Sequence, residues 1–420
     1  MTRHTLRPAL ALGATLAAGA LVLTGCGSGS GFDDDTTTTD DTAGTLTSSD
    51  DALTILIGSS GDAETEAVEA AVAAWSEESG VEATVQVAND LAQQLSQGFA
   101  AGTPADLFYL STDAIAGYAG NGSLQAYGDE LSNKDDFYPS LVENFTVGGD
   151  FYCAPKDFST LALLINDDLW AEAGLTEADI PTTWDELSTV AAALTTGDRV
   201  GLSFGAEYQR VGVFMAQAGG GLVVDGAAAA DSAENVEALG YVASHLQDGT
   251  FAYATELGAG WGGEAFGKQL SAMVIEGNWI TGAMTNDFPD VNYTVAELPA
   301  GPAGQGTLQF TNCWGMAADS PNQQAALDLV EYLTTADSQL AFSEAFGPMP
   351  SIQSAGDTWT SANPELAPFL AGADYAQFMP NLEGATDVVS DFNAQLESLA
   401  TTDPATILGS VQQNLAAIVE

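Results

Sequence analysis

Few residues of this sequence could form a metal or nucleophilic centre. The chain has three cysteines, Cys26, Cys153 and Cys313, and two histidines among 420 residues. A His/Cys metal cluster is therefore excluded, and a Ser-His-Asp triad would have to use His245. Carboxylates are plentiful, at 58 Asp and Glu, but no motif pairs two of them for acid–base hydrolysis. We expect no catalytic residue, no metal and no cofactor.

The N-terminus places one of these thiols where a lipid could be attached. Arg3 and Arg7 precede an uncharged apolar run, Ala9–Leu23, which is typical of a secretory signal and short for a membrane span. The run ends in Leu23-Thr24-Gly25-Cys26, which resembles the lipobox of bacterial lipoproteins. We expect residues 1–25 to be removed and Cys26 to anchor the protein to the outer face of the cell membrane. A cleaved signal with an unmodified cysteine is the alternative.

Residues 26–51 read as a tether between this anchor and a folded domain. The stretch GSGSGFDDDTTTTDDTAGTLTSSDD has one aromatic residue and a run of like charges, so it cannot bury a core. About 370 residues follow, which is enough for two domains.

The charge balance excludes several classes of partner. Residues 1–25 contain two of the seven basic residues, so five basic and 58 acidic residues leave a mature net charge near −53. Binding to nucleic acid or to anionic lipid headgroups would need a basic face. Such acidity suits saline surroundings, and lineage-wide composition bias is the alternative.

The apolar pattern alternates between strands and helices, which predicts α/β layers. Short buried runs at Ala52–Gly58, Ala105–Ser111 and Ser159–Asn166 are strands. PTTWDELSTVAAALTTG is a helix opened by a capping box of Thr183 and Glu186, and SPNQQAALDLVEYLTT is a helix with Ser320 as its N-cap. The loop GSSGD after the first strand lacks a following G-K-[ST], so it is not a phosphate loop.

One region resembles a known family. Phe151–Leu187 is similar to the signature region of bacterial ABC-transporter solute-binding proteins, in the carbohydrate-binding family that includes maltose-binding protein. The shared features are the turn Tyr152–Pro155, a strand ending at Asn166, the helix end Ala173–Leu175 and the motif 181–186, Pro-Thr-Thr-Trp-Asp-Glu. Segments 105–127, 265–280 and 314–342 also resemble the family, in the right order.

The resemblance implies a fold and its boundaries. It implies a two-lobed, periplasmic-binding-protein-like α/β fold, in which each lobe is a mixed sheet flanked by helices and a hinge joins the lobes. Lobe I is expected at 52–157 plus 299–342, and lobe II at 158–298 plus 343–420. The family places the strands of Cys153 and Cys313 side by side, so a disulfide is expected in an oxidising compartment. Two buried thiols are the alternative.

The resemblance also implies ligand contacts. Trp279, in EGNWI, is expected to stack on a sugar ring, with core packing as the alternative. Asp113 is expected to accept sugar hydroxyls, with a helix N-cap role as the alternative. The further candidates are Tyr109, Tyr208, Arg210 and Trp314, the last with core packing as the alternative. One or two of Tyr152, Asp157, Phe158 and Ser159, which enter the hinge strand, are also expected to line the pocket. The set transfers only in part, because Cys153 and Ile165 replace the family's usual Gly and Tyr, and no aromatic lies near Val389.

These observations predict a monomeric, non-enzymatic lipoprotein that captures a neutral sugar or oligosaccharide by hinge closure. It would deliver this ligand to the transmembrane permease subunits of an ABC importer. A binder of another small solute, such as a glycerophosphate or an osmolyte, is the first alternative. Lys156 and Arg210 are the only basic residues in cleft-like motifs, so a phosphate would be poorly served. A secreted glycosidase is the second alternative.

Overall fold

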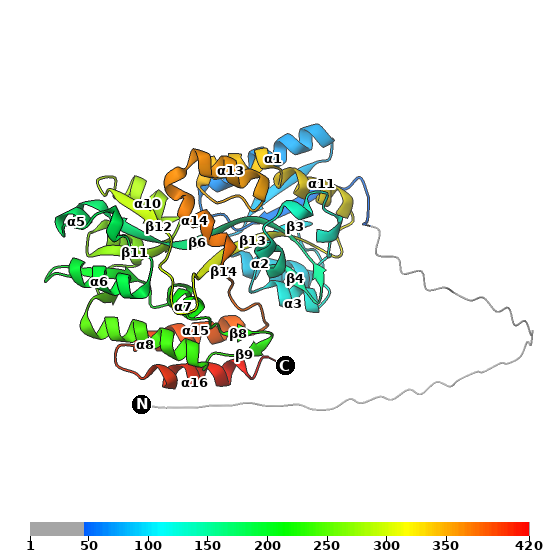
Figure 1. Ribbon diagram of the computed structural model, residues 1–420. Coiled ribbons are helices and arrows are strands. Elements are labelled where there is room, and N and C mark those ends of the chain that lie inside the picture. The colour runs from blue at the N-terminus through cyan, green and yellow to red at the C-terminus, as the bar shows by residue number, and fades with distance from the viewer. Residues whose placement is uncertain (1–45, 420) are drawn as a thin grey trace, which may run out of the picture. The chain divides into compact units, whose positions relative to one another are not determined.

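The computed structural model describes residues 46–419 (Figure 1). The expected signal peptide, Cys26 and the tether as far as residue 45 lie outside the described residues. The described chain starts six residues before the expected beginning of lobe I. Here Thr47 is bound to the segment before α11, because its hydroxyl donates to Ser320 O at 2.7 Å and its carbonyl accepts from Gln324 N at 3.0 Å.

One ten-stranded mixed sheet runs through the molecule. Its main path is β10 (Phe251–Tyr253), β7 (Val200–Phe204), β11 (Ser271–Gly277), β6 (Ala154–Asn166), β13 (Thr307–Met316), β3 (Leu107–Ser111), β1 (Leu53–Ile57) and β2 (Ala83–Val87). Off this path, β12 (Tyr293–Ala296) pairs with β6, and β14 (Ala376–Gln377) pairs with β13. Two small hairpins are formed by β4 (Thr146–Val147) with β5 (Asp150–Phe151), and by β8 (Val223–Val224) with β9 (Ala227–Ala228).

Helices surround both halves of the sheet (Figure 1). Those of the first half of the chain are α1 (Asp62–Ser79), α2 (Leu91–Ala101), α3 (Ile115–Gly120), α4 (Pro139–Asn144), α5 (Asp167–Glu172), α6 (Trp184–Leu194) and α7 (Tyr208–Gln217). Those of the second half are α8 (Ala233–Asp248), α9 (Gly262–Gly267), α10 (Ile280–Asn286), α11 (Gln323–Leu333), α12 (Ala336–Phe346), α13 (Gln353–Ala362), α14 (Ala367–Ala371), α15 (Ala385–Leu396) and α16 (Pro404–Leu415).

Separate hydrophobic cores divide the sheet into two lobes. One core gathers β1, β3, α1 and α11, and the other gathers β7, α6, α7, α8, α15 and α16. The long strands β6 and β13, which pair antiparallel, connect the two. Ile352 and Ala355 belong to the first core, although the sequence boundaries place them in lobe II. The physical reason is that α12 packs on α1, and the start of α13 packs on α12.

The pairing of β6 with β13 is irregular at Lys156, which lines the cleft described below. Asn312 pairs with Asp157 and Cys313 pairs with Pro155, so Lys156 has no opposite residue. An unpaired residue of this kind redirects its side chain out of the regular alternation of a strand.

Two helix starts differ from the sequence prediction. Thr183 does cap α6 by accepting from Glu186 N at 3.3 Å, but the Glu186 carboxylate accepts from Thr182 N, at 2.8 Å, rather than from Thr183 N. The later helix, α11, begins at Gln323 with Asn322 as its N-cap. The hydroxyl of the expected cap, Ser320, donates to the Asp106 carboxylate at 2.7 Å and accepts from Asn322 N at 3.4 Å. The Gln323 N–H that Ser320 would have capped donates to the Thr47 hydroxyl instead, at 3.2 Å.

Candidate functional site: a cleft between the lobes

Three adjoining cavities border both lobes and share Met379. The tryptophan cavity, about 440 Å³, is lined by residues 58–60, 156–159, 278–279, 309–312 and 346–348, with Glu64 and Thr112. The Asp113 cavity, about 320 Å³, is lined by Asp113, Gln209, Phe310 and α15. The Asn144 cavity, about 430 Å³, is lined by Glu143, Asn144, Thr146, Tyr208, residues 221–223, Gly226 and residues 377–382. Together they form the cleft.

Trp279 presents its ring to the tryptophan cavity. It follows β11 directly, is 40% exposed, and is one of three large hydrophobic residues exposed among the described residues. The ring lies over Gly277, where an added Cβ would come within 2.2 Å of ring atoms, and edge-on to Phe310 at 5.5 Å between centroids. A glycine at 277 is therefore needed for the ring to take this position.

A buried ion pair holds Trp279 in place. The Glu276 carboxylate accepts from Trp279 Nε1 at 3.1 Å and from Arg210 Nη2 at 2.7 Å, and the Arg210 guanidinium lies 5.3 Å from the ring centroid. Burial raises the pKa of Glu276, and Arg210 opposes that rise. Arg210 is thus a positioning residue for the tryptophan, with its charge already neutralised.

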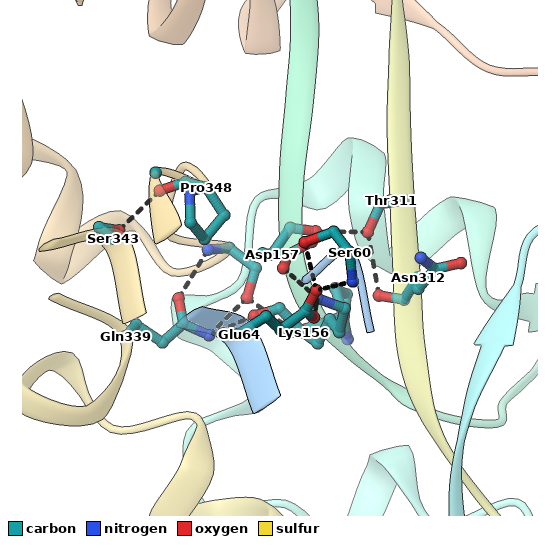
Figure 2. Close-up of polar contacts among 12 residues, drawn as sticks. Ser60, Glu64, Lys156, Asp157, Thr311, Asn312, Gln339, Ser343 and Pro348 are labelled. Atoms are coloured by element: carbon teal, nitrogen blue, oxygen red, sulfur yellow. Dashed lines mark hydrogen bonds and ion pairs between the residues drawn. The ribbon is translucent and has the colours of Figure 1, made fainter. Parts of the chain in front are cut away.

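A second charged cluster forms the wall on the lobe I side (Figure 2). The Lys156 ammonium donates to Glu64 Oε1 at 3.1 Å and contacts Asp157 closely. It also lies 4.5 Å from the centroid of the Tyr109 ring. Glu64 Oε2 accepts from the backbone N–H and the hydroxyl of Ser60, each at 2.7 Å. The single cation is therefore shared by two carboxylates and is not free to bind an anionic ligand.

The titration of this cluster follows from its burial and its contacts. Burial favours a higher pKa for Glu64, but attraction to Lys156 and the Ser60 hydrogen bonds outweigh it, so the pKa lies below its ordinary value. Burial raises the pKa of Asp157 despite Lys156. Burial alone would lower the pKa of Lys156, yet attraction to Asp157 and Glu64 raises it. Lys156 therefore stays charged.

Polar groups of β6, β13 and the β11 end complete the tryptophan cavity. The Ser159 hydroxyl donates to the Asn278 amide oxygen, and Asn278 Nδ2 donates to Gly347 O at 2.9 Å. Gln309 Oε1 accepts from Ser140 at 3.3 Å, while its buried Nε2 has no partner among the described residues. Thr311 and Asn312 also line the cavity. These neutral donors and acceptors suit hydroxyl groups.

The predicted site residues divide into those that line the cleft and those that do not. Trp279, Asp157, Phe158 and Ser159 line the tryptophan cavity, Asp113 lines its own cavity, and Tyr208 lines the Asn144 cavity. Arg210 lies behind Trp279. The other three, Tyr109, Tyr152 and Trp314, line none of these cavities.

Tyr109 and Trp314 are core residues, which corrects the expectation that they reach ligand. Both are almost fully buried, with ring centroids 4.9 Å apart on the paired strands β3 and β13. Tyr152 packs against the first core. The strand alternation explains this, since side chains on one face of a buried strand point away from the cleft.

Cys153 and Cys313 form a disulfide, with Cα atoms 5.7 Å apart. Cys153 directly precedes β6, and Cys313 is in β13, so the bond joins these two segments next to the irregular pairing at Lys156. It therefore ties together the two strands that cross between the lobes.

Sequence reasoning missed several polar cleft residues. These are Ser60, Glu64, Asn278, Gln309, Thr311 and Asn312. One signal was available, because the GSSGD loop follows the carboxyl end of β1, and ligands of open α/β sheets bind beyond such strand ends. The neutral residues of β13 had no comparable signal.

Within residues 46–419, no helix is both long and apolar enough for a membrane span. The same residues contain no group of three or more His, Cys, Asp or Glu side chains arranged to hold a metal ion.

Comparison with known proteins gives the family. A Brucella abortus (strain 2308) protein named as a binding protein is 25% identical over 351 residues, which cover 79% of this chain and 83% of that protein. The cyclic alpha-maltosyl-1,6-maltose binding protein from Arthrobacter globiformis has a TM-score of 0.78 at 22% identity, covering 88% of this chain and 98% of that chain. UgpB from Mycobacterium tuberculosis, in complex with glycerophosphocholine, has a TM-score of 0.74 at 18% identity, covering 87% and 98%.

These likenesses confirm the two-lobed α/β fold that the sequence predicts. A family model described as bacterial extracellular solute-binding protein matches residues 70–368, which is more than half of the chain. The chain therefore belongs to the bacterial extracellular solute-binding protein family.

Proposed function

We propose that this protein is the receptor of an ABC importer and that it captures a neutral sugar or oligosaccharide in the cleft. The observation that carries the proposal is the ring of Trp279, 40% exposed at the cavity and braced by Gly277 and Arg210. Sugars have apolar C–H faces that pack on such a ring and hydroxyl rims that need neutral donors and acceptors. Both kinds of group line the tryptophan cavity.

The lobes would close around the ligand as rigid bodies joined by β6 and β13. The proposed lobes follow the sequence boundaries, 52–157 plus 299–342 and 158–298 plus 343–420, except that Leu46, Ile352 and Ala355 are assigned to lobe I because they pack in its core. A ligand that contacts both lobes at once favours the closed state in proportion to those contacts. A monomer suffices for this cycle, and the closed form would be delivered to the permease subunits.

The anchor is part of the proposal. Cleavage after Gly25 and acylation of Cys26 would hold the protein at the outer face of the membrane. Cys26→Ala should release the protein into the medium with ligand binding unchanged. Retention of this variant in the membrane fraction after a salt wash would show that the anchor lies elsewhere.

A different small solute is the second candidate, and the likeness to UgpB favours considering it. The described residues of the cleft include no unpaired positive charge to bind a phosphate. Lys156 is shared by Glu64 and Asp157, and Arg210 is paired with Glu276, so neither cation is available.

Enzymatic activity has little support. Residues 201–205 have a G-x-S-x-G pattern, but Ser203 lies within strand β7, where it is buried with its hydroxyl 2.7 Å from Ser271 Oγ. His245 contacts Ser188 at 2.9 Å, but that hydroxyl is in mid-helix and bonds back to Trp184 O. In the cleft, Glu64 and Asp157 both contact Lys156 and are thereby held as an ion-pair cluster.

A thermal-shift screen of neutral sugars, glycerophosphodiesters and betaine-type osmolytes tests the proposal. A ligand that binds the folded state raises the melting temperature by mass action. We expect saccharides to be the hits, and chromatography of the mixture to recover them intact. Hits confined to phosphodiesters, or hydrolysis of a saccharide, would refute the proposed function.

A further inference from the structure

We propose that the ligand is a neutral oligosaccharide of at least three units, and that the side chain of Asn144 binds the unit farthest from Trp279. This inference rests on the proposed saccharide-binding function. It adds the length of the ligand and a binding residue at the far end of the cleft.

The first observation is the continuity of the three cavities. The tryptophan and Asp113 cavities share Thr112, Phe310 and Met379. The Asp113 and Asn144 cavities share Met379 and Pro380. The volumes of the three cavities are about 320–440 Å³. Each is therefore at least as large as the smallest ordinary ligand sites, which have roughly 300 Å³. A monosaccharide on Trp279 would leave two of the three without contact.

The second observation is the state of the Asn144 side chain. Asn144 ends α4, lines the cavity named after it and is 2% exposed. Neither its Oδ1 nor its Nδ2 has a hydrogen-bond partner among the described residues. Burial of a polar group without a partner is unfavourable, and native structures contain few such groups. The Asn side chain has two N–H donors and one acceptor oxygen, so neighbouring ligand hydroxyls, each of which can donate or accept, would give partners to both amide atoms.

Other buried asparagines show that this state is particular to Asn144. Asn166 lacks a partner for Nδ2, but its Oδ1 caps α5 by accepting from Leu169 N at 2.9 Å. Asn235 lacks a partner for Oδ1, but its Nδ2 donates to Gly221 O at 2.8 Å. Both have a structural role. Among the described residues, Asn144 is the one side chain whose two amide atoms are both buried and without a partner.

A neighbouring amide extends the same surface from a different segment. Asn381 Nδ2 donates to Asn144 O at 3.3 Å, and its buried Oδ1 has no partner among the described residues. The Asn381 side chain, from the segment between β14 and α15, therefore lies at the backbone of Asn144 at the end of α4. A ligand held here touches both segments.

The chemistry of the middle and far cavities fits a neutral chain. Phe310, Met379 and Val389 offer apolar surface in the Asp113 cavity. Asp113 is the one charged residue that lines this cavity, and Glu143 is the one that lines the Asn144 cavity. Neither cavity has a cation to bind a carboxylate or a phosphate. Alternating apolar and neutral polar surface matches the alternating faces and rims of linked sugar rings.

The experiment measures affinity against ligand length. The full chain is titrated calorimetrically with neutral saccharides of one to four units, in α-1,4-glucan, β-1,4-glucan, β-1,4-xylan and β-1,4-mannan series. We expect a series that binds to gain at least tenfold in affinity between two and four units. Asn144→Ala should remove that gain, and the ligand-free melting temperature should not fall, because no protein hydrogen bond is lost. Asn381→Ala should also reduce the gain in affinity between two and four units, and this variant replaces Asn144→Ala if the latter does not fold.

The matched control is Asn133→Ala. Its Oδ1 is also buried without a partner, but it lines a separate cavity of about 630 Å³ that shares no residue with the cleft. This variant should leave every affinity unchanged.

The outcomes separate the two proposals. Equal affinity for all lengths, or a loss in Asn144→Ala that is the same at every length, overturns the inference and leaves saccharide binding intact. Failure of the wild-type protein to bind any saccharide overturns the proposed function, and the inference with it.

Discussion

The Thr386 hydroxyl donates a hydrogen bond to Asp113 Oδ2 across the cleft, at 3.1 Å between the oxygens. Asp113 follows β3 in the first lobe, and Thr386 is in α15, whose apolar side joins the core of the second. The contact therefore spans the two lobes directly. It also uses one of the carboxylate oxygens that the sequence predicts to be available for sugar hydroxyls.

Thr386→Val should weaken ligand binding modestly. If the bond forms only when the lobes are together, its loss removes about 0.5–1.5 kcal/mol from the closed state, which is up to about tenfold in affinity. Calorimetric titration measures this effect. The control is Thr285→Val, which makes the same substitution at the exposed end of α10. Unchanged affinity in Thr386→Val would mean that the bond is present in the open and closed states alike.

Trp279→Ala should lower affinity at least tenfold with little change in the melting temperature of the ligand-free protein. The ring is exposed to the cavity, so its removal deletes an aromatic contact worth about 0.5–1.5 kcal/mol beyond the buried area. Trp184→Ala is the contrasting variant, since Trp184 is buried and its Nε1 donates to Gln217. That variant should lose about 3–5 kcal/mol of stability. A large drop in melting temperature for Trp279→Ala, with affinity kept, would identify it as a structural residue.

Glu64→Gln should make stability less dependent on pH in the acid range. The folded-state pKa of Glu64 lies below its usual value near 4.5, so the folded protein binds fewer protons there than the unfolded chain. Its contribution is therefore present above pH 4.5 and is lost as the pH falls through the lowered pKa. We expect wild type to exceed the variant by about 1–3 kcal/mol at pH 7, from the hydrogen bonds of a buried charged group, and by less near pH 3.5.

Urea unfolding at several pH values measures that difference. Glu77→Gln, on the exposed face of α1, removes the same charge without touching the cluster. A wild-type advantage over Glu64→Gln that stays constant from pH 7 to 3.5 would contradict the assigned ion pair.

Removal of the disulfide should destabilise the protein. Cys153 and Cys313 are 160 residues apart in sequence, so the bond restricts a large part of the unfolded chain. The double variant Cys153→Ala/Cys313→Ala should lose about 2–5 kcal/mol in a urea titration. Thiol titration of the unfolded, unreduced protein carrying Cys26→Ala provides the direct check, and two free thiols there would refute the bond.

Local sequence patterns determined much of the architecture. Short apolar runs identified strands β1, β3 and β6, and the alternation with helical patterns indicated α/β layers. The segment EGNWI singled out Trp279, whose ring is exposed beside the tryptophan cavity in the structure. These features depend on residues close in sequence, where periodicity and glycine placement are informative.

Tertiary structure decided which polar residues meet in the cleft. The Lys156 cluster joins residues 92 positions apart, and Ser159 meets Asn278 across 119 positions. The Gln323 N–H that Ser320 was predicted to cap is bound instead by the Thr47 hydroxyl, 276 positions away. The two amide atoms of Asn144 became conspicuous only because the fold buries them beside a cavity without a partner. No local pattern encodes such meetings, because they depend on how the chain brings β6, β13 and the segments of both lobes together. The sequence by itself determined the elements and the family they resemble, and the packing of those elements decided the cleft.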